Sequence, residues 1–157
     1  MLFAMPFLSL LRGAEIEQLI AAANSAFRLA VDCEITIEAN PEDARLFPEQ
    51  AAAGVSRFSI GAQAFDEAAL RALGRKHDAA ASLRAVEAAA ATGKRVSLDL
   101  IYAREGQGVQ AWRDELAQAL ALPVEHVSLY QLTIEPDTAF ARRVERGQLS
   151  PPDQEQA

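Results

Sequence analysis

Cysteine is almost absent from this chain of 157 residues, which contains Cys33 and no other thiol. A lone cysteine forms no internal disulfide and cannot build a cysteine-rich zinc or iron–sulfur site. Basic residues are also scarce, because 15 Lys and Arg stand against 22 Asp and Glu and leave a net charge of −7. Phosphate backbones and anionic lipids repel such a chain, so nucleic acid is excluded as an expected partner.

No apolar run in the sequence is long enough to cross a membrane. The most apolar segment, residues 1–11, has no basic flank and is far shorter than the ~20 residues that a spanning helix needs. We expect this segment to form a buried strand followed by a turn. With one cysteine and no membrane span, the chain is expected to be cytoplasmic.

The motifs of several enzyme classes are missing as well. Residues 106–108 (Gly-Gln-Gly) match neither the GxGxxG pattern nor a Walker motif with its lysine, and are weak evidence for phosphate binding. No GxSxG elbow is present, and Cys33 has no evident activating partner in the sequence. These absences argue against a hydrolase.

Hydrophobic periodicity predicts strands and helices in alternation, with Asp66, Asp78 and Asp137 at helix starts. The predicted strands are residues 34–39, 55–61, 95–101 and 125–132. The predicted helices are residues 14–27, 48–54, 66–74, 78–93, 109–122 and 137–147. Such alternation favours βαβ units with a parallel sheet. We expect one domain over residues 1–147 and a polar tail over 148–157.

The predicted strands have two unlike faces, whereas a parallel sheet covered on both sides is apolar on both. One face is apolar and carries Ile35, Ile37, Phe58, Ile60, Val96, Leu98, Leu100, Val127 and Leu129. The other is polar and carries Glu34, Thr36, Glu38, Arg57, Ser59, Gln63, Ser97, Asp99, Ser128 and Tyr130. If helices cover the apolar face, the polar face lines water or a ligand, as in an incompletely closed βα barrel.

The chain is too short for a closed barrel, which takes about 250 residues. We therefore predict an α/β fold: a partial βα barrel of four or five parallel strands with helices on the outer face. At least one parallel edge is then exposed. An uncovered edge invites pairing with another chain, so self-association through this edge is expected if nothing else covers it.

Polar side chains follow the predicted strands at one end of the sheet. Glu38, Gln63 and Asp99 lie at or just beyond the C-terminal ends of their strands, where βα barrels bind ligands. Carboxylates accept hydrogen bonds from ammonium groups or ribose hydroxyls, and Gln both donates and accepts. Arg75 follows a short helix, where a cation suits the helix dipole or could pair with a ligand carboxylate. The alternative is that all four are solvated residues on an open sheet.

Five segments together resemble a known family. They are residues 34–41 (EITIEANP), 54–65 (GVSRFSIGAQAF), 73–77 (LGRKH), 99–102 (DLIY) and 128–136 (SLYQLTIEP). In this order and spacing they resemble the radical SAM proteins of the oxygen-independent coproporphyrinogen III oxidase group, and especially its haem chaperone branch, HemW. The last segment is more similar to the chaperones than to the oxidases.

The resemblance implies a partial βα barrel that holds S-adenosylmethionine (SAM) and a [4Fe–4S] cluster at the C-terminal ends of its strands. On the matching positions it implies SAM contacts for Glu38, Gln63, Arg75 and Asp99. Asp99 would lie near the ribose, and Glu38 or Arg75 near the methionine end. Ile101 would be an apolar neighbour of the adenosyl group. The resemblance also implies a role with haem or porphyrin, and haem as a further ligand.

The chain departs from the family pattern in several places. It has no counterpart of the CxxxCxxC cluster motif. The family's Gly-Gly-Thr-Pro turn corresponds to residues 3–6 (Phe-Ala-Met-Pro), and its Gly-Leu-Pro-Gly-Gln turn to residues 103–107 (Ala-Arg-Glu-Gly-Gln). The family's C-terminal domain is also missing. We therefore expect a fragment that is inactive alone, with no catalytic residue and no metal ligand assigned; an oxidase-like fragment and a non-catalytic α/β interaction domain are the alternatives.

Overall fold

Helices and strands follow one another along the chain in a computed structural model that describes residues 8–147 and Ser150. The elements are η1 (Leu8–Leu10), α1 (Gly13–Phe27), β1 (Thr36–Ala39), η2 (Pro41–Leu46), α2 (Phe47–Ala52), β2 (Arg57–Gln63), α3 (Glu67–Ala72), α4 (Ala79–Ala91), β3 (Arg95–Tyr102), α5 (Val109–Leu120), β4 (His126–Gln131) and α6 (Ala139–Glu145), where η marks a 3-10 helix.

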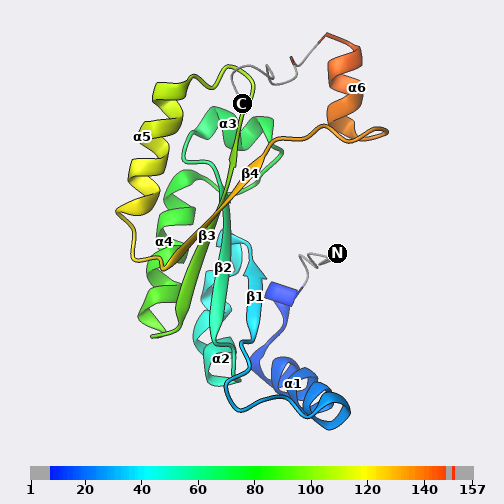
Figure 1. Cartoon of the computed structure of the whole chain (residues 1–157), viewed down its shortest axis with the longest axis vertical. Coiled ribbons are helices and arrows are strands. Elements are labelled where there is room, and N and C mark those ends of the chain that lie inside the picture. Colours follow the sequence, from blue (N-terminus) through cyan, green and yellow to red (C-terminus); the bar gives the residue numbers. More distant parts are fainter. Residues whose placement is uncertain (1–7, 148–149, 151–157) are drawn as a thin grey trace.

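Four parallel strands form one open sheet in the order β1-β2-β3-β4 (Figure 1). Each strand pairs with the next one along the chain, and all three pairings are parallel. Within the described residues, β1 and β4 each have a single neighbour, so the sheet does not close. The predicted partial βα barrel of four or five parallel strands is therefore confirmed, with four.

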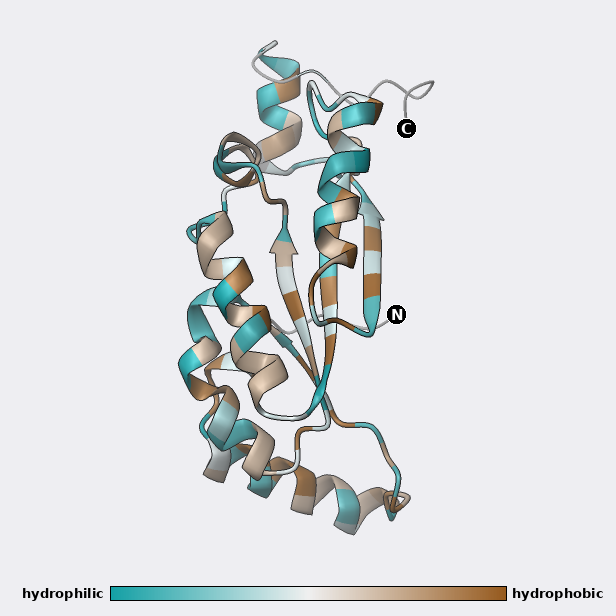
Figure 2. Cartoon of the chain, turned by 90° about the vertical axis from the view of Figure 1, so that its left-hand side faces the viewer, coloured by the Kyte–Doolittle hydropathy of each residue, from teal (hydrophilic) through white to brown (hydrophobic). Residues whose placement is uncertain are grey.

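Helices cover the apolar face of this sheet. In Figure 1, α4 and α5 lie on one side of the strands. Phe58, Ile60, Leu98 and Leu100 are fully buried beneath the helices, and the rings of Phe58 and Phe47 lie 4.7 Å apart between centroids. Figure 2 shows the hydrophobic residues alternating with paler ones along the strands. The apolar-face residues of β1, β2 and β3 are buried as predicted, whereas Leu129 on the edge strand β4 is 44% exposed; the helices lie on the outer face as expected.

Two predicted helix starts are confirmed by single hydrogen bonds. Asp66 and Asp78 each accept a hydrogen bond from the backbone N–H three residues further on, at 2.7 and 2.6 Å. The last predicted start is wrong by one residue, because Thr138 rather than Asp137 caps α6. Asp137 has a φ of 63° and belongs to the preceding turn.

Two short 3-10 helices carry too few residues to show a period in the sequence. η2 follows β1 directly, where the sequence Asn40-Pro41 is typical of a turn. η1 falls in the segment predicted as a strand followed by a turn, and residues 1–7 of that segment lie outside the described part. The predicted tail, residues 148–157, also lies outside it except for Ser150. None of the described helices is both long and apolar enough to cross a membrane.

Candidate functional site

Glu38 and Asp99 lie on the same face of the sheet with Ser59 between them. Glu38 on β1 is in register with Ser59 on β2. Ser59 Oγ lies 3.1 and 3.0 Å from the two carboxylate oxygens of Asp99 on β3 and donates to that carboxylate. The structure thus brings these two predicted site residues together on the polar face.

The Asp99 carboxylate is half-buried and held by hydroxyl groups. Burial raises the pKa of Asp99 above its ordinary value, whereas hydrogen bonds from Ser128 and Ser59 and the electrostatic influence of His126 and Arg57 act to lower it. An ionised carboxylate that accepts from the Ser59 hydroxyl retains further lone pairs that can accept hydrogen bonds from a ligand. Asp99 is therefore a preorganised acceptor on the polar face.

Gln63 ends β2 with an irregular backbone. Its φ is 68°, in the left-handed region that residues with a Cβ rarely adopt, and the register of β2 against β3 shifts between Ile60 and Gln63. Gly61 makes room for its side chain, because a Cβ on Gly61 would come within 2.8 Å of Gln63 Nε2. The bulge therefore folds the Gln63 amide back over Gly61.

Arg75 and Ile101 complete the set of predicted residues. Arg75 is half-buried beyond α3; burial lowers the pKa of its guanidinium, and Glu42 of η2 opposes that effect. Because η2 follows β1 directly, Arg75 lies near the C-terminal end of β1. Ile101 comes two residues after Asp99 on β3, in register with Tyr130, and so shares the face that carries Asp99.

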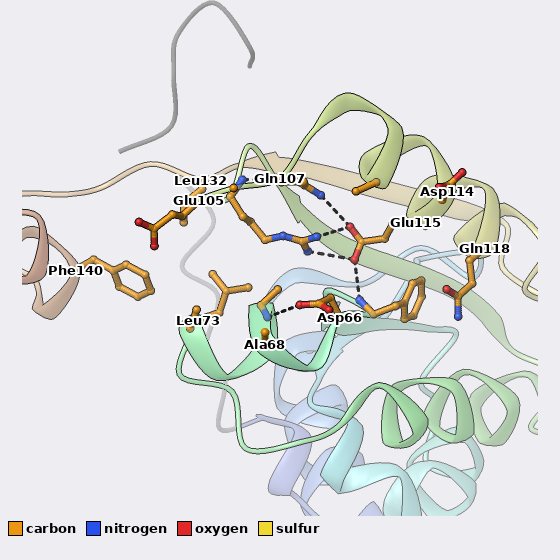
Figure 3. A pocket seen from close by; sticks show the side chains of 16 residues that line it. Asp66, Ala68, Leu73, Glu105, Gln107, Asp114, Glu115, Gln118, Leu132 and Phe140 are labelled. Carbon is orange, nitrogen blue, oxygen red and sulfur yellow. Dashed lines mark hydrogen bonds and ion pairs between the residues drawn. The ribbon is translucent and has the colours of Figure 1, made fainter. Parts of the chain in front are cut away.

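A pocket of about 580 Å³ lies between α3 and α5 (Figure 3). It is lined by α3 residues such as Ala68 and Ala72, by Leu73 directly after α3, by the loop that follows β3, and by α5. None of the five predicted SAM contacts lines it. The pocket and the predicted ligand site on the polar face are therefore different places.

A buried ion pair beside this pocket has no counterpart in the sequence predictions. Arg104 Nη1 and Nη2 donate to the two carboxylate oxygens of Glu115 at 3.2 and 2.6 Å, and Gln107 Nε2 donates to the same carboxylate at 3.1 Å. The side chains of Arg104 and Glu115 are only 10% and 7% exposed. Helical spacing supplies a signal for this pair, because Glu115 falls between Trp112 and Ala119 on the inward stripe of α5.

The described residues do not fit an iron–sulfur cluster. Cys33 is the sole cysteine and is exposed. No group of three or more His, Cys, Asp and Glu side chains in the described part of the chain is arranged to hold a metal ion. Residues 3–6, which correspond to the family's Gly-Gly-Thr-Pro turn, lie outside the described residues. No cluster ligand is therefore assigned to this chain.

The chain is similar to curated proteins whose names match the family that its motifs resemble. The heme chaperone HemW of Escherichia coli K12 is 41% identical over 138 residues, which cover 86% of this chain and 36% of that protein. The protein named radical S-adenosyl methionine domain-containing protein 1, mitochondrial, from Danio rerio is 37% identical over 150 residues, which cover 94% of this chain and 34% of that protein. The chain thus spans about a third of the length of the curated relatives it matches.

Solved structures show the same fold. Coproporphyrinogen III oxidase (HemN) from Escherichia coli, described as a radical SAM enzyme, superimposes with a TM-score of 0.75 at 24% identity, covering 93% of this chain and 34% of that one. Methylornithine synthase (PylB) gives a TM-score of 0.71 at 11% identity, covering 92% and 39%. The model of the radical SAM superfamily matches residues 6–130. The open parallel sheet, its polar face and these matches agree: the chain belongs to the radical SAM superfamily.

Proposed function

We propose that this chain binds SAM on the polar face of its sheet, as part of a barrel of the HemW type. The observation that carries the proposal is that Glu38 on β1 and Asp99 on β3 share the face that the helices leave free, with Ser59 of β2 between them and bonded to Asp99. The HemW-named relatives support the chaperone branch at 41% identity, whereas the oxidase structure is 24% identical. The oxidase-like alternative is therefore less favoured.

The polar side chains of the predicted site suit the polar groups of SAM. Asp99 is proposed to accept hydrogen bonds from the ribose hydroxyls, and Glu38 to accept from the methionine ammonium group. Arg75 is proposed to pair with the methionine carboxylate and Gln63 to add a neutral hydrogen bond. Ile101 on the same face is proposed to pack against the adenosyl group.

The proposal concerns binding and not cleavage of SAM. Reductive cleavage needs an electron from a cluster; this sequence contains one cysteine, and residues 8–147 include no group of three or more His, Cys, Asp and Glu side chains arranged to hold a metal ion. Weak affinity is expected, because the Gly-Gly-Thr-Pro turn and the cluster that chelates the methionine group are both missing from this sequence.

Isothermal titration calorimetry of the chain with SAM tests the proposal. We expect binding in the range of ~0.1 to 1 mM, weakened at least tenfold in Glu38→Ala and Asp99→Ala, since a hydrogen bond to a charged group contributes about 1.5–3 kcal/mol. Glu87→Ala is the matched control, because Glu87 is an exposed carboxylate on α4. No heat at millimolar SAM, or binding that both variants retain, would contradict the proposal.

Haem is proposed as a second ligand, on the strength of the relatives' printed name. His77 is buried and its Nε2 lies 3.1 Å from the Ala62 carbonyl oxygen, so it is not free for an axial bond. His126 and Cys33 are exposed. An optical titration with haem should therefore show a shifted Soret band that weakens in His126→Ala or Cys33→Ser. A titration in which both variants match the parent chain would count against these ligands.

Self-association and a cytoplasmic location are two further proposals. Self-association through an open sheet edge is supported by the exposure of Leu129 and Tyr130 on β4, which are 44% and 55% exposed. A cytoplasmic location is supported by the cysteine content, although relatives with a mitochondrial name also exist. The non-catalytic interaction domain of the sequence analysis is compatible with the first of these proposals.

A further inference from the structure

The backbone at the end of β2 is held by side chains from three other segments. The Ala62 carbonyl oxygen lies 3.1 Å from His77 Nε2, and the Gln63 carbonyl accepts from Arg104 Nη1 at 3.4 Å. The Phe65 N–H donates to Glu115 Oε1 at 2.7 Å. Three backbone groups within four residues are thus fixed by side chains, immediately around the irregular residue Gln63.

The Glu115 carboxylate is the centre of this arrangement. It accepts hydrogen bonds from the Phe65 N–H, from both terminal nitrogens of Arg104 and from Gln107 (Figure 3). Glu115 belongs to α5 and Arg104 to the loop after β3, so one carboxylate ties together a helix, a loop and the end of a strand. Four donors on one nearly buried carboxylate fix its position.

The left-handed conformation of Gln63 is supported by a backbone hydrogen bond from the Ala64 N–H to the Ala62 carbonyl oxygen at 2.8 Å and by the side-chain contacts around it. A φ of 68° is unfavourable for a residue with a Cβ, and such conformations persist where surrounding contacts determine them. The contacts of Arg104 and Glu115 fall on the carbonyl of Gln63 and on the N–H two residues later. Arg104 therefore holds the peptide plane that directly follows Gln63, and Glu115 holds both Arg104 and the next peptide plane along the chain.

We propose that Glu115 and Arg104 are positioning residues that hold Gln63 in its left-handed conformation, so that its side-chain amide is presented on the polar face. The expected effect of this pair on SAM affinity rests on the proposed function, whereas its effect on the conformation of Gln63 does not. Glu115 lies on α5, against the opposite face of the sheet from Asp99, so it acts through Gln63 and does not touch the ligand. Arg104 belongs to the loop that reads Ala-Arg-Glu-Gly-Gln in place of the family's Gly-Leu-Pro-Gly-Gln, whereas Glu115 belongs to α5.

The geometry is tested without any ligand by NMR of Glu115→Gln. We expect the Phe65 amide proton to move upfield, because a short bond to a charged carboxylate becomes a bond to a neutral amide, and we expect the Gln63 side-chain amide resonances to shift. Asp114→Asn, an exposed carboxylate on the same helix, is the control and should leave both unchanged. Unchanged Gln63 side-chain resonances in Glu115→Gln would overturn the proposal.

The consequence is tested by calorimetry in two backgrounds. Glu115→Gln should weaken SAM binding at least fivefold in the parent chain and by less than twofold in the Gln63→Ala variant, because its effect passes through that side chain. Equal weakening in both backgrounds would show a general structural role and overturn the proposal. Arg104→Lys, which keeps the charge but loses the two-pronged contact, serves as the second variant if Glu115→Gln does not fold. If the parent chain binds no SAM, the proposed function fails while the NMR result still decides the positioning role.

Discussion

At the scale of the residue, the burial of Asp99 is unfavourable for its charged form, and its proposed role is to bind a ligand. Its carboxylate is half-buried on the sheet, and burial raises its pKa. Replacing it with a core residue would remove that cost, yet the two serine hydroxyls that face it would then lose their acceptor. Carboxylates whose pKa is shifted by burial are frequent at functional sites, which agrees with the proposed role of Asp99.

Asp99→Asn should change how stability depends on pH. A carboxyl whose pKa is higher in the folded than in the unfolded chain binds more protons when folded, so it stabilises the fold at low pH and this stability is lost as pH rises through the folded pKa. In thermal melts, the Tm of the variant should therefore rise relative to that of the parent chain as pH is raised from the ordinary aspartate pKa towards neutrality. A difference in Tm that does not vary with pH would contradict the assignment.

Gly61→Ala should disturb Gln63 and little else. The added Cβ would meet Gln63 Nε2 at 2.8 Å, so the side-chain amide must move. We expect a loss of SAM affinity similar to that of Gln63→Ala, with a Tm within a few degrees of the parent, as measured by calorimetry and thermal melts. Gly108→Ala is the control, because nothing lies within 4 Å of its added Cβ. Equal effects of the two substitutions on affinity would argue against the contact.

At the scale of the element, a helix or strand can be predicted from sequence when it is long enough to show a hydrophobic period or has a clear cap residue. The helices that begin after Asp66 and Asp78 follow from cap residues and apolar spacing, and both caps are present. The start of α6 is off by one residue because Asp137 and Thr138 are adjacent and both suit an N-cap. η2 and the bulge at Gln63 are missed because each depends on tertiary contacts over a few residues, which leave no period to read.

The contribution of the Asp78 cap to stability can be measured directly. Its carboxylate accepts from the Ala81 N–H at 2.6 Å at the start of α4, the helix that packs against β2 and β3. Asp78→Ala should lower the free energy of unfolding by about 0.5–2 kcal/mol in urea titrations. Glu87→Ala, an exposed substitution on the same helix, should change it by less than about 0.5 kcal/mol. A cap variant as stable as this control would refute the role of the cap.

At the scale of the whole molecule, the architecture can be predicted from the sequence because it depends on the number of strands and helices and on the order in which they alternate. Alternating strands and helices indicate a parallel sheet, and two unlike strand faces indicate that only one is covered by helices. The shared face of Glu38 and Asp99 follows too from the alternation of side chains along parallel strands, although Asp99 lies within β3 (Arg95–Tyr102) and not at its end as predicted. The Arg104–Glu115 pair does not follow, because it joins a loop to a helix that are neighbours only after folding.

The open edge at β4 gives the last prediction. Its backbone has no pairing partner on one side within the described chain, and Leu129 on it is 44% exposed. Parallel-strand edges pair readily with a second chain, and a lysine on an edge strand discourages this. Size exclusion with light scattering should show a discrete oligomer at micromolar concentration, converted to monomer by Leu129→Lys but not by Leu19→Lys on the exposed face of α1. A parent chain that stays monomeric would contradict pairing at this edge, and heterogeneous aggregates would show that the edge is unprotected surface and not an interface.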